Sequence, residues 1–103
     1  MQNLVKQFNE EKMCHEKVMP VSARLLDVIS EVGELGKEVL KSTKYGTIDF
    51  EMSDDFKMEF GDVVYSLLSL ANETGIDAEE CLKLAVDKYQ KRIDSKNDMG
   101  SGN

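Results

Sequence analysis

Apolar residues recur at intervals of three and four along most of the chain, the spacing of one face of an α-helix. The single proline, Pro20, precedes the longest such run, and no Asn-Gly or Asp-Gly turn separates alternating apolar residues. The pattern predicts helices at about 2–15, 21–42, 54–74 and 78–94. The residues expected to face the core on the last three helices are Val21, Leu25, Val28, Val32, Leu35 and Val39; Phe56, Phe60, Val63, Val64, Leu67 and Ala71; and Leu82, Ala85, Val86, Tyr89 and Ile93. The sequence therefore predicts an all-α fold, a compact four-helix bundle.

Polar residues and glycine mark where these helices begin and end. Ser53 is a good N-cap for the third helix, and Gly75 is a stop signal at its end. Asp77 opens the fourth helix in a sequence that resembles a capping box. Residues 1–95 are expected to form a single helical domain, and the polar, glycine-containing residues 96–103 are expected to form a flexible C-terminal tail.

The charge of the chain excludes several classes of partner. With 13 Lys and Arg against 20 Asp and Glu in 103 residues, the net charge is −7, which disfavours binding to a nucleic-acid polymer or a membrane surface. There is no apolar run of about 20 residues, and the first residues do not resemble a secretion signal. Cys14 and Cys81 are isolated. We expect a cytoplasmic protein, and its small size favours self-association.

One short pattern occurs twice, as Glu31-Val32-Gly33-Glu34 and as Glu59-Phe60-Gly61-Asp62. Positions i and i+3 of a helix lie on one face, so each helix directs two carboxylates the same way. If the two helices are neighbours, four carboxylates can meet. A solvated acidic face that binds nothing is the plain alternative.

The surroundings of these acids favour a binding site. Glu31, Glu59 and Asp62 have no Lys or Arg three or four residues away on their own helix, and only Glu34 has one, Lys37. Like charges at that spacing destabilise a helix by roughly 0.2–0.5 kcal/mol per pair, so an unrelieved acidic stripe indicates a cation from outside the chain. Carboxylate ligands alone suit Mg²⁺ or Mn²⁺ rather than zinc.

Glycine occupies the same place in both motifs, at Gly33 and Gly61. A glycine inside a helix costs roughly 0.5–1 kcal/mol relative to alanine. We expect another backbone to approach closely at these positions, which would draw the carboxylates of the two helices together. Neutral drift on an exposed turn is the alternative.

Four segments, in order, resemble the signature of a known family. Glu31-x-x-Glu34, then 24 residues, then Glu59-x-x-Asp62 resembles the E-x-x-E…E-x-x-D motif of the MazG-like nucleoside triphosphate pyrophosphohydrolases, within the all-α NTP pyrophosphatase superfamily. The segments that carry the likeness are Ser30-Glu-Val-Gly-Glu-Leu-Gly36, Met58-Glu-Phe-Gly-Asp-Val-Val64, Leu70-Ala71 with Gly75-Ile76-Asp77, and Lys88-Tyr-Gln-Lys-Arg92. The resemblance covers about Val21 to Ile93.

This resemblance implies Mg²⁺-dependent hydrolysis of a nucleoside triphosphate to the monophosphate and pyrophosphate. It implies that four residues are the catalytic metal ligands, that a basic pair holds phosphates, and that the protein is a homodimer or a homotetramer built from dimers. Carried over to this chain, the metal ligands are Glu31, Glu34, Glu59 and Asp62, and the basic pair is Lys88 and Arg92. A helix end that is merely solvated remains an equal alternative for the basic pair.

The family often has a further glutamate immediately before each motif. In this sequence those two positions are Ser30 and Met58. This departure motivates a second hypothesis, a non-catalytic helical interaction or regulatory protein whose acids bind a cation. We do not interpret Cys14 and His15 as a catalytic nucleophile and its base, because side chains at adjacent helix positions point about 100° apart. Tyr45 and Phe50 could contact a base or simply pack within their loop.

Overall fold

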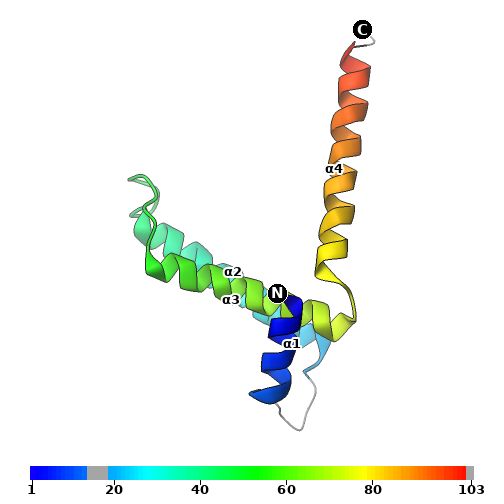
Figure 1. Cartoon of the computed structure of the whole chain (residues 1–103). Coiled ribbons are helices and arrows are strands. Elements are labelled where there is room, and N and C mark those ends of the chain that lie inside the picture. Colours follow the sequence, from blue (N-terminus) through cyan, green and yellow to red (C-terminus); the bar gives the residue numbers. More distant parts are fainter. Residues whose placement is uncertain (14–18, 102–103) are drawn as a thin grey trace.

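The computed structural model describes residues 1–13 and 19–101, and these residues form four helices and no strand (Figure 1). The helices are α1 at Gln2–Glu11, α2 at Val21–Ser42, α3 at Asp54–Thr74 and α4 at Ala78–Ser101. The predicted all-α class is confirmed, and the bounds of α2 and α3 coincide with the predicted ones.

Two helix ends differ from the prediction. α1 ends at Glu11 and not near residue 15, because the apolar pattern weakens after Glu10 and leaves nothing for a further turn to bury. The predicted end of this helix, including Cys14 and His15, lies outside the described residues. α4 continues to Ser101, so residues 96–101 are helical where a flexible tail was expected. Polar residues do not end a helix by themselves.

The predicted helix signals act as expected. Ser53 Oγ accepts a hydrogen bond from the Phe56 backbone N–H at 3.0 Å and caps α3. Gly75 ends α3 in the left-handed conformation, with φ of +76°. Asp77 Oδ1 accepts from the Glu80 backbone N–H at 3.1 Å at the start of α4.

α2 and α3 form an antiparallel pair, α1 packs against α3, and α4 points away from all three (Figure 1). The small core lies where α1 meets α3 and holds Val5, Leu68 and Ala71. Ser66 and Ser69 are also buried. None of the described helices has the length and apolar character needed to cross a bilayer.

The expected compact bundle is not formed within one chain. The radius of gyration is 18.3 Å, and the molecule measures 61 × 40 × 22 Å, whereas a globular domain of this length has a radius of about 13 Å. The difference arises from α4, which makes no extended contact with another helix. Of the four helices in the described part of the chain, only α1, α2 and α3 pack together.

Several residues expected in the core are therefore exposed. On α2, Val28, Leu35 and Val39 are half-buried against α3. The other members of that pattern are exposed, as are all the large apolar residues on the predicted inner face of α4, because a single chain supplies no helix to cover them. The core-facing prediction is wrong, within one chain, for Val21, Leu25, Val32, Phe60, Leu67, Leu82, Val86, Tyr89 and Ile93.

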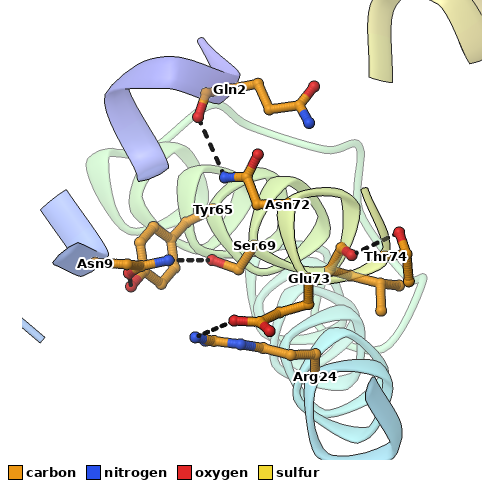
Figure 2. Close-up of polar contacts among 9 residues, drawn as sticks. Gln2, Asn9, Arg24, Tyr65, Ser69, Asn72, Glu73 and Thr74 are labelled. Carbon is orange, nitrogen blue, oxygen red and sulfur yellow. Dashed lines mark hydrogen bonds and ion pairs between the residues drawn. The ribbon is translucent and has the colours of Figure 1, made fainter. Parts of the chain in front are cut away.

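Polar contacts hold α1 against α3 (Figure 2). The Tyr65 hydroxyl donates to Asn9 Oδ1, and Asn9 Nδ2 donates to Ser69 Oγ at 3.1 Å. Nearer the start of α1, Asn72 Nδ2 donates to the backbone carbonyl of Gln2 at 3.3 Å. These contacts fix α1 relative to α3, the helix that carries one of the two acidic motifs.

Candidate metal centre

Three of the four predicted acidic residues meet between α2 and α3. Glu31 comes from α2, and Glu59 and Asp62 come from α3. One carboxylate oxygen of each lies within 4.8 Å of the others. Glu31 and Glu59 are half-buried, whereas Asp62 is exposed. The spacing that placed Glu59 and Asp62 on one face of a helix thus also directs them toward the neighbouring helix.

The charge of this cluster is not balanced by the protein. Among the residues that the structure describes, no lysine or arginine forms an ion pair with Glu31, Glu59 or Asp62. The pKa of Glu59 is raised above its usual value, first by partial desolvation and then by the negative charges of Asp62, Glu34, Glu31 and Glu38. A cation placed between these oxygens would remove that repulsion.

Glu34 lies beside the cluster but not in it. Its side chain is half exposed, and its carboxylate lies 3.8 Å from Lys37 Nζ, one turn further along α2. Its charge still contributes to the raised pKa of Glu59. The structure therefore brings together Glu31, Glu59 and Asp62, and it leaves Glu34 at the edge in an ion pair that the sequence spacing had indicated.

Glu38 belongs to the surroundings of this centre although the sequence analysis did not select it. Its charge contributes to the raised pKa of Glu59, and its Oε1 lies 3.4 Å from the Ser53 hydroxyl. The available signal was its spacing of seven residues from Glu31, two turns along the same face of α2.

The predicted phosphate-binding pair lies apart from the acids in this chain. Lys88 and Arg92 are on α4, which points away from α2 and α3 (Figure 1). Both are close to the Tyr89 ring, with Lys88 Nζ 4.9 Å and Arg92 Cζ 6.0 Å from its centroid. The structure does not bring this pair to the acidic cluster within one chain.

The two motif glycines do not mark a close approach between α2 and α3. In the described part of the chain, a Cβ at Gly33 or Gly61 would meet no atom of another helix within 4 Å. The expectation that these glycines draw the carboxylates together is wrong within one chain. The acids meet because the two helices pack antiparallel in a register that places Glu31 opposite Glu59 and Asp62.

The structure also describes the other residues that the sequence singled out. Ser30 and Met58, which replace the additional glutamates, are both exposed. Phe50 packs on Phe56, with ring centroids 4.9 Å apart. Tyr45 is 81% exposed and has a positive φ of 59°.

The donor set of the cluster fits a hard divalent cation. It offers only carboxylate oxygens, from two half-buried residues and one exposed residue. Mg²⁺ and Mn²⁺ favour such oxygen ligands and leave room for water or phosphate oxygens, whereas zinc favours nitrogen and sulfur.

Comparison with known proteins identifies the family. Residues 21–95 match the family model of the MazG nucleotide pyrophosphohydrolase domain. The chain belongs to the MazG nucleotide pyrophosphohydrolase family. The match includes α2 and α3, with both acidic motifs, and begins after α1.

Two further proteins are similar to this MazG-family chain. Over 79 residues it is 32% identical to the gene 37 protein of Mycobacterium phage L5, covering 75% of this chain and 69% of the phage protein. The fold matches the crystal structure of YPJD from Bacillus subtilis, named there as a candidate pyrophosphatase. The TM-score is 0.70 at 27% identity, over 88% of this chain and 90% of that one. The four-helix arrangement is thus shared with a solved structure.

Proposed function

We propose that this MazG-family protein is a Mg²⁺-dependent nucleotide pyrophosphohydrolase that converts a nucleoside triphosphate to the monophosphate and pyrophosphate. The observation that carries the proposal is the convergence of Glu31, Glu59 and Asp62, which places three uncompensated carboxylate oxygens within 4.8 Å of one another. The family match over residues 21–95 supports the same reaction class.

The acidic residues would bind a divalent cation, and that cation would bind the phosphates of the substrate. Mg²⁺, or Mn²⁺ in its place, would supply Lewis acidity toward the phosphates and activate water for attack at the α-phosphorus. Glu31, Glu59 and Asp62 would hold the cation from two helices. Glu34 would join them by leaving Lys37, a partner that is exposed and weakly held. A chain of net charge −7 needs such a cation to attract a triphosphate.

Lys88 and Arg92 are proposed as phosphate-binding residues that act on a site in a second copy of the chain. Within one chain they lie on the helix that points away from the acids. They flank the exposed apolar face of α4, so a copy that covered this face would come close to them. The alternative, a solvated helix end, predicts that their removal has no effect on substrate binding.

Self-association, as a homodimer or a homotetramer, is supported by two uncovered apolar faces. One is on α4. The other is on α2, beside the residues that pack on α3. Large apolar patches on a protein surface often mark an interface with another chain. The residues concerned, all between 46% and 62% exposed, are Leu82, Val86, Tyr89 and Ile93 on α4 and Leu25, Ile29, Val32 and Leu40 on α2.

One assay tests the reaction directly. The purified protein is incubated with each common ribonucleoside and deoxyribonucleoside triphosphate and Mg²⁺, and both products are measured. Release of pyrophosphate together with the monophosphate is expected for at least one substrate, and is expected to stop when the cation is chelated. Release of orthophosphate would contradict cleavage between the α- and β-phosphates.

The competing function is that of a non-catalytic regulatory protein that binds a cation. Ser30 and Met58 favour it, because neither supplies a carboxylate where the family often has a further glutamate. The same assay separates the two hypotheses. Cation binding without turnover of any nucleotide would support the regulatory protein, whereas turnover would exclude it.

A further inference from the structure

The acidic centre depends on the register of α2 and α3, that is, on their relative position along the helix axes. Glu31 lies on one helix, and Glu59 and Asp62 lie on the other. One helical turn is about 5.4 Å. That exceeds the 4.8 Å within which the three oxygens lie. A slip of the helices by one turn would therefore separate the ligands. Whatever fixes the register of this pair also determines whether a cation can be held.

Glu38 and Ser53 connect the two helices at the end nearest their loop. The Ser53 hydroxyl lies 3.4 Å from Glu38 Oε1, at the long end for a hydroxyl that donates to a carboxylate. The same Ser53 oxygen accepts from the backbone N–H of Phe56 and so begins α3. Both side chains are half-buried. Glu38 on α2 is thus bound to the residue that defines where α3 starts.

Glu38 is also close to the acidic centre electrostatically. Its negative charge is one of those that raise the pKa of Glu59. Among the described residues it has no ion pair that would explain its presence at a half-buried position. Glu38 therefore adds to the repulsion between the acids and has no positively charged partner to offset it, so its position is better explained by another interaction.

We propose that Glu38 is a positioning residue for the metal centre, which acts by accepting the Ser53 hydrogen bond and so fixing the register in which Glu31 faces Glu59 and Asp62. Glu38 would not contact the cation. This inference rests on one part of the proposed function, the binding of a divalent cation by the three acids, and does not require catalysis. Groups that hydrogen-bond directly to metal ligands typically change cation affinity by 10–100-fold when removed, and we expect the lower end of that range for Glu38, which acts through the register of the two helices.

Mn²⁺ binding, measured by calorimetry without nucleotide, tests the proposal in two pairs of variants. Glu38→Ala removes the acceptor, and Ser53→Gly removes the donor while keeping a residue that serves as an N-cap. Each is expected to weaken Mn²⁺ binding about tenfold. Glu38→Gln keeps the acceptor oxygen and Ser53→Thr keeps the hydroxyl, so both are expected to bind within about threefold of the wild type. The variant with both Glu38→Ala and Ser53→Gly should bind no more weakly than either single variant, because one contact is lost in all three.

Asp27→Ala is the matched control, since it removes an exposed carboxylate from the same helix one turn from Glu31. It should bind Mn²⁺ as the wild type does. All measurements are made at a temperature where circular dichroism shows every variant folded. Unchanged affinity in Glu38→Ala and Ser53→Gly would overturn the positioning role alone, as would an equal loss in Glu38→Gln. Absence of Mn²⁺ binding by the wild type would overturn the proposed function itself, and the positioning role with it.

Discussion

Arg24 and Glu73 join the start of α2 to the end of α3, with their charged atoms 3.5 Å apart (Figure 2). Their side chains are only 15% and 24% exposed, and the Arg24 Nε–H is buried without a hydrogen-bond partner. The two helices that carry the acidic centre are thus held at this end by a largely buried ion pair, and near their loop by Glu38 and Ser53.

Removing one member of this pair should destabilise the fold. Glu73→Ala leaves a guanidinium in a poorly hydrated position, and we expect it to lower the free energy of unfolding by about 1–3 kcal/mol. Replacing both residues, as Arg24→Met with Glu73→Leu, should return the chain to within about 1 kcal/mol of the wild type. Urea unfolding followed by circular dichroism measures both. A double variant as unstable as Glu73→Ala would show that the pair is not the source of the effect.

The contact between α1 and α3 should depend on the Tyr65 hydroxyl. Tyr65→Phe removes the donor to Asn9 Oδ1 and is expected to cost about 1 kcal/mol in the free energy of unfolding. Lys6→Ala, at an exposed position of α1, is the control and should leave stability within about 0.5 kcal/mol. If the two variants have equal stability, the hydrogen bond does not hold α1 in place.

Stability should depend on pH through Glu59. Its pKa in the folded chain lies above the ordinary value of 4.5, so folding favours the protonated carboxyl. This group therefore supports folding below about pH 4.5 and opposes it as the pH rises through the raised pKa. Glu59→Gln, which resembles the protonated form, should raise the unfolding temperature at pH 7 without divalent cation. The difference from the wild type should vanish near pH 4. A Glu59→Gln variant less stable than the wild type at pH 7 would contradict the repulsion described here.

Turnover should depend on acids from both helices. Glu34→Gln and Asp62→Asn are each expected to abolish pyrophosphate release, because each removes a negatively charged ligand, while helicity stays unchanged. Asp27→Asn, which removes an equivalent charge from α2 outside the centre, should retain activity. Pyrophosphate release retained in both ligand variants would remove these residues from the site.

The local structure could be predicted from the sequence because it depends on neighbours along the chain. The N-cap at Ser53, the left-handed Gly75 and the bounds of α2 and α3 each follow from a few adjacent residues. The spacing of Glu59 and Asp62 likewise fixes their common face. The end of α1 was less predictable, because an apolar pattern that weakens after Glu10 does not fix the last helical residue.

The packing could not be predicted in the same way, because it depends on what each helix meets in space. The apolar pattern of α4 predicts a face that packs against another helix. It does not reveal that no helix of the same chain packs there. Gly33 and Gly61 suggested a close approach that α2 and α3 do not make. The spacing of Glu38 from Glu31 indicates a shared face of α2, but it does not reveal the contact with Ser53, which lies across the loop.

The central claim is that carboxylates from α2 and α3 hold one divalent cation, and anomalous scattering from crystals soaked in Mn²⁺ tests it most directly. We expect a peak about 2.0–2.3 Å from carboxylate oxygens of Glu31, Glu59 and Asp62. Crystals that show no peak there, with these side chains turned apart into solvent, would contradict it.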